Sequence, residues 1–286
     1  MSNLLILGAG VYQIPLIQRA RAMGHHVAVA SWSADDPGMR LGHEAWVVDT
    51  KDKDVLLRMA KEKKIEGVAT TGTDVAVPSL GFICEAFGLP GVSYDTALKC
   101  SNKICMQKAF AEHGVRAASH ENATSLKETC AAAEKLGYPV IVKAPDSSGS
   151  RGVVAAFSAA ELTFAFQQAM DVSRCGSVLI ENLLMGTEFG CQLIVLDGEV
   201  AACIFHNDTV TPSPISTPIG HSCPSFLSIS VRHDAEQVCA KAIRALGIRY
   251  AVCNADLIAT AAGVFMLELG ARMGATGIPE IIRLHT

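Results

Sequence analysis

The chain has 286 residues, half of them apolar, with a net charge of −4 and a pI near 6.1. This composition predicts a soluble protein with a substantial core, in one large domain or two to three modest ones. It excludes a general attraction to nucleic acid or to an acidic membrane surface, so we expect a small-molecule ligand.

The N-terminus lacks the basic segment and cleavage site of a signal peptide, and no apolar run approaches eighteen residues, so we expect a cytoplasmic protein. The ten cysteines are scattered singly without a Cys-x-x-Cys pair. That spacing favours reduced, structural thiols over a zinc or redox site.

In the first 95 residues, short apolar runs alternate with amphipathic stretches, which is typical of βαβ units and a parallel sheet. We expect strands at Leu4–Leu7, His26–Ala30, Trp46–Val48 and Gly67–Thr70. The expected helices are Gln13–Met23, Asp52–Lys63 and Asp74–Phe87. Together these elements predict a first, open α/β domain.

A helix at Thr96–His113 is expected to lead into a second region of mixed and antiparallel strands. Its expected elements are the strands Tyr138–Ala144, Val153–Phe157, Ser177–Glu181, Phe189–Val195 and Glu199–Phe205 and the helix Ala159–Met170. Asp197-Gly198 is a hairpin signal between the last two strands. The segment His206–Ser225 is predicted to be one long irregular loop, and such loops are often functional.

The turn Gly8-Ala9-Gly10 lies between a predicted strand and helix, as a dinucleotide-binding turn would. Gln13 replaces the third glycine of that motif, and no acidic residue ends the second strand. An NAD-dependent oxidoreductase is therefore a weak alternative, and a turn beside a small-molecule pocket is favoured.

The stretch "NADLIATAAGVFMLELGARMG" predicts two strands, Asn254–Thr260 and Val264–Gly270, joined by a three-residue turn. Pairing residue 260 with 264 places Asp256 directly opposite Glu268. Two carboxylates so close repel each other unless a cation lies between them, and hard oxygen ligands suit Mg²⁺ bound to a nucleotide. Arg272 follows on the same alternation and could reach a phosphate or carboxylate.

Lys143 lies in the apolar run "IVKA", where a buried ammonium needs an anionic partner, and phosphate would supply one. The following loop, residues 147–152, offers backbone N–H groups and hydroxyls that could close over phosphates.

The ordered set Lys103, Lys143, Glu181, Glu188, Asp256, Glu268 and Arg272 resembles the ATP-grasp superfamily over nearly the whole chain. The stretches "SNKICMQKAFAEHGV", "VKAPDSSGSRGV" and "LIENLLMGTEFG" carry the resemblance, and "GAGVYQIPLI" and "VATTGTDVAVPS" are similar to the pre-ATP-grasp domain of the biotin carboxylase and carbamoyl phosphate synthetase group. The resemblance implies an α/β and α+β fold: an N-terminal open parallel pre-ATP-grasp domain, 1–95, then a two-lobed ATP-grasp domain, 96–286, with a lid lobe at about 115–185 and a C-terminal lobe at about 186–286.

The resemblance also implies roles for individual residues. Glu181 would accept from the adenine amino group, the backbone of the next three residues would meet the adenine edge, and Glu188 would bind ribose. Asp256 and Glu268 would hold Mg²⁺ or Mn²⁺, and Arg272 and Lys143 would act in catalysis. The implied nucleotide-binding set is Lys103, Lys143, Ser147, Ser148, Gly149, Ser150, Gly152, Glu181, Asn182, Leu183, Leu184 and Glu188.

Two features depart from the family pattern. Gly270 stands where the family usually has an asparagine that helps to hold the second metal, and we hypothesise that Asn254, which the register places opposite Gly270, supplies the lost amide. The chain also stops at Thr286, soon after the metal motif, so we expect it to be truncated or to need a partner subunit.

The implied function is an ATP-dependent, ADP-forming ligase that joins a carboxylate to an amine or thiol through an acyl phosphate. The implied partners are small-molecule carboxylate and amine substrates, without nucleic acid or membrane, and a homodimer is left open. A nucleotide-binding or regulatory subunit without independent catalysis is the alternative. The sequence leaves both substrates open, with Gln13, Thr73, Asp74, His206 and His221 as candidates for the acceptor site.

Overall fold

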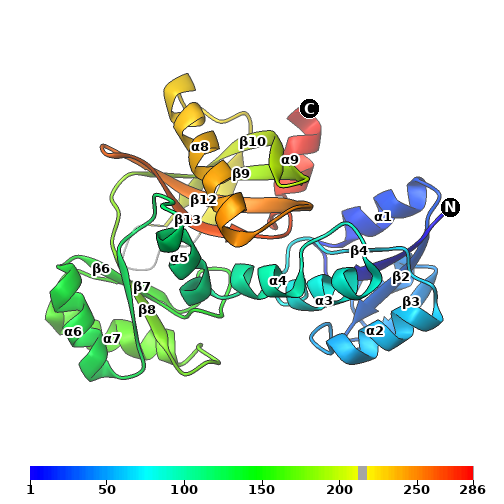
Figure 1. Ribbon diagram of the computed structural model, residues 1–286, viewed down its shortest axis with the longest axis horizontal. Helices are drawn as coiled ribbons and strands as arrows, with labels where there is room; N and C mark the ends of the chain where they lie inside the picture. The colour runs from blue at the N-terminus through cyan, green and yellow to red at the C-terminus, as the bar shows by residue number, and fades with distance from the viewer. Residues whose placement is uncertain (212–217, 286) are drawn as a thin grey trace.

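The computed structural model describes residues 1–211 and 218–285. Within them the chain forms three β-sheets, which Figure 1 shows in three different parts of the molecule. A four-stranded parallel sheet comes first, a four-stranded antiparallel sheet follows, and a five-stranded antiparallel sheet comes last.

The first sheet has the strand order β3-β2-β1-β4 and is covered on both faces. On one face Leu5 belongs to the core that contains Leu56 and Ile83, and on the other Ile6 packs with Ile17. Burial on both faces explains the near-continuous apolar runs of the strands. The elements are β1 (Asn3–Leu7), α1 (Ile14–Ala22), β2 (His26–Ser31), the 3₁₀ helix η1 (Met39–Leu41), β3 (Glu44–Val47), α2 (Lys53–Glu62), β4 (Gly67–Ala69) and α3 (Val77–Phe87).

The single helix expected at Thr96–His113 is two helices, α4 (Tyr94–Cys100) and α5 (Lys103–Glu112). Asn102 has an extended backbone with φ −138°, and its side chain accepts hydrogen bonds from the backbone N–H groups of Ile104 and Cys105. Such an N-cap begins a new helix, so the expectation was wrong at this junction.

The second sheet has the order β5-β8-β6-β7, with two helices packed on it. Its elements are β5 (His120–Ala123), α6 (Leu126–Leu136), β6 (Val140–Lys143), β7 (Val153–Ala156), α7 (Ala159–Met170) and β8 (Val178–Asn182). It encloses its own apolar core, separate from that of the rest of the chain. The helix expected at Ala159–Met170 is confirmed, whereas β5 and α6 were not predicted.

The third sheet has the order β11-β10-β9-β12-β13. Helix α8 packs on one face through Ala235, Val238 and Ala242, which recur at helical spacing. The opposite face carries polar side chains, because core and polar residues alternate along β9 and β12. The elements are β9 (Thr187–Leu196), β10 (Glu199–Val210), β11 (Pro218–Ser222), α8 (Ile229–Leu246), β12 (Ala251–Thr260), β13 (Gly263–Gly270) and α9 (Ile278–His285).

The segment His206–Ser225 is more regular than expected. β10 runs on to Val210, and β11 pairs with it so that Asp208 lies opposite His221. Residues 212–217 of the expected loop lie outside the described residues. The expectation of one irregular segment was wrong because backbone pairing, which composition does not reveal, extends across these polar residues.

Candidate active site

The acid pair at the end of the chain is held by a hairpin with a β-bulge. Thr260 pairs with Gly263, so the turn has two residues rather than the predicted three. A register shift after Asp256 then restores the pairing of Asp256 with Glu268. Without that bulge the alternation would turn Glu268 toward the core beside Met266, so the extra residue brings the two carboxylates to one face.

The environment of Asp256 disfavours its own negative charge. Burial, together with the neighbouring charges of Glu268 and Asp208, raises the pKa of Asp256 to about 6. Acids that repel each other in this way would be stabilised by a bound cation, and carboxylate oxygens suit Mg²⁺ or Mn²⁺. The donor set therefore fits the metal that the sequence predicts.

Two lysines from distant segments lie at this site. Lys103, at the start of α5, forms an ion pair with Glu268 at 3.0 Å and donates to the backbone oxygen of Ser147 at 2.7 Å. Lys143, at the end of β6, is buried and forms an ion pair with Glu181. Burial opposes its charged form, yet Glu181 raises the pKa of Lys143 above its ordinary value, so the ammonium stays charged.

The serine–glycine loop connects β6 to β7 beside these lysines. Gly149, Ser150 and Gly152 all have positive φ, at +67°, +56° and +67°. The hydroxyl of Ser147 is buried without a hydrogen-bond partner in the structure. Turns of this kind can direct backbone N–H groups at an anion, so the loop has the donors that a phosphate needs.

The end of β8 and the two residues that follow it carry polar groups that could meet the base of a nucleotide. Glu181 is 2% exposed, and its Oε1 atom lacks a hydrogen-bond partner in the structure. A buried, unpaired acceptor is costly and would be satisfied by an amino group of a ligand. Asn182 and Leu183 already donate their backbone N–H groups to Ser119 and Pro139, so a donor to an adenine edge would fall to Leu184.

Arg272 lies between the last sheet and the first region of the chain. Its Nη2 donates to Asp74 Oδ2 at 2.8 Å, and its Nε lies 2.8 Å from Asp74 Oδ1. The adjacent bridge between Thr71 and Met273 fixes the same junction. Of the acceptor-site candidates, Asp74 is therefore brought to the site.

Asn254 is the neighbour of Asp256 on β12. Its Nδ2 donates to Asp256 Oδ1 at 2.9 Å, and its Oδ1 accepts from Gln192 Nε2 at 2.6 Å. The backbone N–H of Gly274 donates to Gln192 Oε1 at 2.8 Å, which sets the orientation of both amides. In this arrangement Asn254 orients the carboxylate, and its role as a metal ligand stays a prediction.

Glu188 lies on β9 on the same face as Gln192, and burial raises its pKa. Gln192 and Asp208 were not singled out from the sequence. The alternation of Glu188, Gly190 and Gln192 against the apolar residues of β9 was the signal that could have identified Gln192.

The Gly8–Gly10 turn is occupied by the chain itself. A side chain at Gly8 would meet Gln13 Cδ at 3.1 Å, and Gln13 Nε2 donates to the backbone oxygen of Thr71. Gln13 therefore fills the space above the turn that a dinucleotide pyrophosphate would need. This geometry disfavours the NAD alternative.

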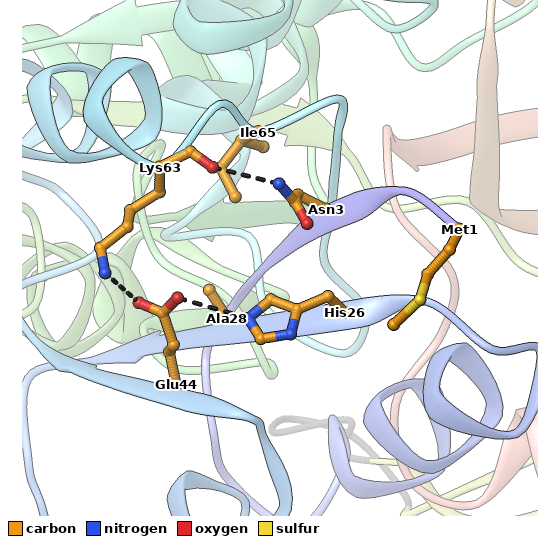
Figure 2. Close-up of a pocket in the computed structure, with 7 residues that line it drawn as sticks. All are labelled: Met1, Asn3, His26, Ala28, Glu44, Lys63 and Ile65. Carbon is orange, nitrogen blue, oxygen red and sulfur yellow. Dashed lines mark hydrogen bonds and ion pairs between the residues drawn. The ribbon is translucent and has the colours of Figure 1, made fainter.

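A pocket of about 330 Å³ lies at the amino ends of the strands of the first sheet (Figure 2). Glu44 forms an ion pair there with Lys63 at 2.8 Å and a hydrogen bond with His26 at 3.3 Å. Hydrogen bonds from Lys63 first, and then from Trp46, lower the pKa of Glu44 to about 2. Ligands of open α/β sheets bind at the carboxyl ends of the strands. This pocket lies at the starts of β1, β2 and β3, so we assign its ion pair a structural role.

The family described as "Carbamoyl-phosphate synthase L chain, ATP binding domain" matches residues 102–276, and the chain belongs to it. Membership confirms the predicted ATP-grasp superfamily and, with the relatives below, the enzyme class of ATP-grasp ligases. The mixed α/β fold is confirmed as well.

Among curated proteins, the chain is 25% identical over 245 residues to an uncharacterized protein of Sinorhizobium fredii, covering 83% of this chain and 50% of that one. It is 24% identical to the formate-dependent phosphoribosylglycinamide formyltransferase of Methanocaldococcus jannaschii, covering 97% and 72%. The chain thus spans only half the length of the first of these relatives.

Among solved structures, a phosphoribosylglycinamide synthetase from Anaerococcus prevotii superposes with a TM-score of 0.80 at 30% identity, covering 99% of this chain and 71% of that one. An L-amino acid ligase from Bacillus licheniformis superposes with a TM-score of 0.82 at 22% identity, covering 97% and 68%, which shows the shared fold.

Proposed function

We propose that the protein is an ATP-dependent, ADP-forming ligase that joins a carboxylate to an amine, or less often a thiol, through an acyl phosphate. The observation that carries the proposal is the convergence of Lys103 and the Asp256–Glu268 pair, which come from segments far apart in the sequence. The orphaned Oε1 of Glu181 beside Lys143 supports an adenine nucleotide as the ligand.

In this proposal ATP is a substrate that lies between the second and third sheets. Glu181 and Leu184 meet its adenine, Glu188 its ribose, and Lys103, Lys143 and the 147–152 loop its phosphates. Asp256 and Glu268, with Asn254 as a further candidate, would hold Mg²⁺ or Mn²⁺. When bound, the ion would neutralise phosphate charge.

The carboxylate substrate attacks the γ-phosphate and ADP leaves; the amine then displaces phosphate from the acyl carbon. Phosphoryl transfer asks for little covalent chemistry from the protein, so positioning and charge neutralisation dominate. Arg272 and Lys143 stabilise the transferring charge. Closure of the 147–152 loop excludes water, which would otherwise hydrolyse the acyl phosphate.

Each cation of the proposed site is already paired with a carboxylate: Lys103 with Glu268, Lys143 with Glu181 and Arg272 with Asp74. Phosphates must therefore replace or join these carboxylates when ATP binds. Because the pairs keep the cations charged and in place beforehand, the cost of ordering them falls on folding rather than on binding.

The finer assignments are also proposals. Residues 1–95 would form the pre-ATP-grasp domain and 96–286 the two-lobed ATP-grasp domain, in a cytoplasmic protein that acts alone, as a homodimer or with a partner region. Among the described residues, no helix is long and apolar enough to span a bilayer. The names of the relatives suggest formate and L-amino acids as the first substrates to try.

The test combines binding with turnover. We expect Mg-ATP, but not NAD, to raise the unfolding temperature, since a ligand at a hundred times its Kd stabilises by about 2.7 kcal/mol. We expect ADP release with at least one member of a panel of carboxylates and amines. Lys103→Met should abolish it, whereas Lys108→Met on the exposed face of the same helix should not. Stabilisation by NAD alone would overturn the proposal.

A further inference from the structure

The polar face of the third sheet extends beyond the acid pair. Along β9, Glu188, Gly190 and Gln192 alternate on this face. Asp256 lies opposite Gly190 on β12, and His206 lies opposite Gly190 on β10. Neighbouring strands are about 4.8 Å apart, so the acid pair and the histidine face the same space, with backbones about 10 Å apart.

Gly190 makes room for this histidine. A Cβ atom at Gly190 would overlap the imidazole ring of His206, which means that the ring leans across β9. His206 is only 1% exposed, so a buried polar ring fills the gap between β10 and β12. Its nitrogen atoms must therefore find partners in the protein.

The partners of His206 determine its tautomer. Because Gln192 Oε1 accepts from the Gly274 backbone, Gln192 Nε2 is the donor toward Asn254 Oδ1 and toward His206 Nε2, which lies 3.1 Å away. His206 Nε2 is then an acceptor, and its Nδ1–H donates to Asp208 Oδ1 at 2.8 Å.

His206, Asp208 and His221 place their ligand atoms within 4.8 Å of one another, as a metal site would. A metal on Nδ1 of His206 would leave a proton on Nε2, which must then donate to a neighbour. That neighbour is Gln192 Nε2, itself a donor. The donor set disfavours a metal and favours a hydrogen-bonded relay.

The relay ends at the protein surface. His221 Nδ1 lies 2.6 Å from the same Asp208 Oδ1, and His221 Nε2 lies 2.7 Å from the hydroxyl of Thr276. Burial opposes the charge of Asp208, but hydrogen bonds from His206 and His221 lower its pKa below the ordinary value. An ionised Asp208 holds the proton on His221 Nδ1 and leaves Nε2 as a base.

Thr276 has an unusual backbone conformation. It is exposed, and its φ of +53° is a strained value for a β-branched residue. It lies four residues after Arg272, on the loop whose Gly274 contacts Gln192. The loop after β13 therefore carries both Arg272, which the proposed function places near the phosphates, and the Thr276 hydroxyl, which lies beside His221.

We propose that Thr276 and His221, oriented by Asp208, accept the proton of the acceptor amine, an inference that rests on the proposed function. From β11 to β12 there are three inter-strand steps, about 14 Å between backbones. The ligand class is a primary amine, which enters as an ammonium ion.

The proton balance is simple. The ammonium ion passes one proton through the Thr276 hydroxyl to His221 Nε2, and the freed nitrogen lone pair forms a bond to the acyl carbon. The bond from that carbon to the phosphate oxygen breaks, and phosphate leaves with the electron pair. A second nitrogen proton goes to the departing phosphate, and the imidazolium returns its proton to water.

The charged and titratable groups around His221 suit this task. Asp208 contacts it directly from β10, and His206 lies edge-on to it with ring centroids 5.4 Å apart. Glu188 on β9 and Asp256 on β12 lie further along the same face. The neighbouring carboxylates favour a cationic acceptor over an anionic one.

Two nucleophiles separate this inference from the proposed function. The purified protein is incubated with Mg-ATP and with formate or one L-amino acid as the carboxylate. The nucleophile is either hydroxylamine, which is neutral at pH 7, or a protonated amine: methylamine, ethanolamine or an L-amino acid. Hydroxylamine reports acyl phosphate formation without a base. The variants are His221→Gln, Thr276→Val and Thr276→Ser. The control is His233→Gln, a change of an exposed side chain on α8.

We expect His221→Gln and Thr276→Val to lower amide formation about 10²- to 10⁴-fold, as loss of a general base does, while hydroxamate formation stays near the wild-type level. Thr276→Ser should restore amide formation. The inference alone would be overturned by any of three outcomes: an equal loss of amide and hydroxamate formation in the variants, full amide formation by Thr276→Val, or hydroxamate but no amide in wild type. Absence of both hydroxamate and amide in wild type would overturn the proposed function with it.

Discussion

At the scale of single residues, the acid pair lowers the stability of the folded protein, because its carboxylates are placed where a cation could bind. The pKa of Asp256 is raised from 3.8 to about 6 because the fold buries its charge beside Glu268 and Asp208. A folded protein that raises the pKa of an acid is most stable when that acid is protonated, and stability falls as pH rises through the interval between the two values. A bound cation would reverse this penalty.

Asp256→Asn removes the charge and gives the first prediction. Without metal, the variant should match wild type near pH 3.8 and become more stable than wild type as pH rises to about 6, with a plateau above it. The gain should be on the order of 1 to 3 kcal/mol, since one pKa unit corresponds to about 1.4 kcal/mol. Urea unfolding at pH 4 and pH 8 measures it, and Mg-ATP stabilisation should be lost. Equal stability at pH 8 would contradict the prediction.

At the scale of the elements, the third sheet depends on two backbone features. The bulge in β13 turns Glu268 to the polar face, and Gly190 lets the His206 ring cross β9. Both decide where neighbouring side chains can lie, and together they join the acid pair to the histidine relay.

Gly190→Ala tests this arrangement. Its Cβ would overlap the His206 ring and force it out of a packed, hydrogen-bonded position, so we expect a loss of about 1 to 3 kcal/mol in the free energy of unfolding. Gly220→Ala on β11 is the matched control, because its Cβ would meet only Thr209 Cβ at 4.0 Å. That control should stay within about 0.5 kcal/mol of wild type. Similar losses in both variants would show that the ring position is not the cause.

At the scale of the whole molecule, the first region is tied to the last sheet through Asp74 and Arg272. The apolar core is also continuous between them, since Leu5 of β1 and Leu193 of β9 belong to one cluster. The second sheet has its own core, and Figure 1 shows it apart from the other two. Motion of that lobe would therefore break fewer packed contacts than separation of the first region.

The Asp74–Arg272 pair can be tested with a double-mutant cycle. Arg272→Met leaves a partly buried carboxylate without its partner, so it should lower stability by about 1 to 3 kcal/mol. Adding Asp74→Asn should recover part of that loss, because the unpaired charge is removed. Urea unfolding of the four proteins gives the coupling energy. Strict additivity would mean that the pair does not join the two regions.

Local patterns in the sequence accounted for much of the fold. The parallel strands of the first region and the helix Ala159–Met170 follow from apolar runs and helical spacing. The pairing of Asp256 with Glu268 was predicted as well, but it depends on a bulge that the predicted turn did not contain. Helix α8 has the same kind of pattern, at Ala235, Val238 and Ala242, and was missed although the signal was present. The resemblance to the ATP-grasp superfamily then assigned roles to the charged residues from Lys103 to Arg272, which spacing alone does not do.

The sequence by itself determined which segments form strands and helices and which charges must find partners, because periodicity and burial act over a few residues. Only the tertiary structure decided the bulge in β13 and the relay from Gln192 to Thr276. The relay joins strands β9, β10 and β11 and a loop far along the chain. Its hydrogen bonds depend on strand order and register, which short-range spacing does not encode.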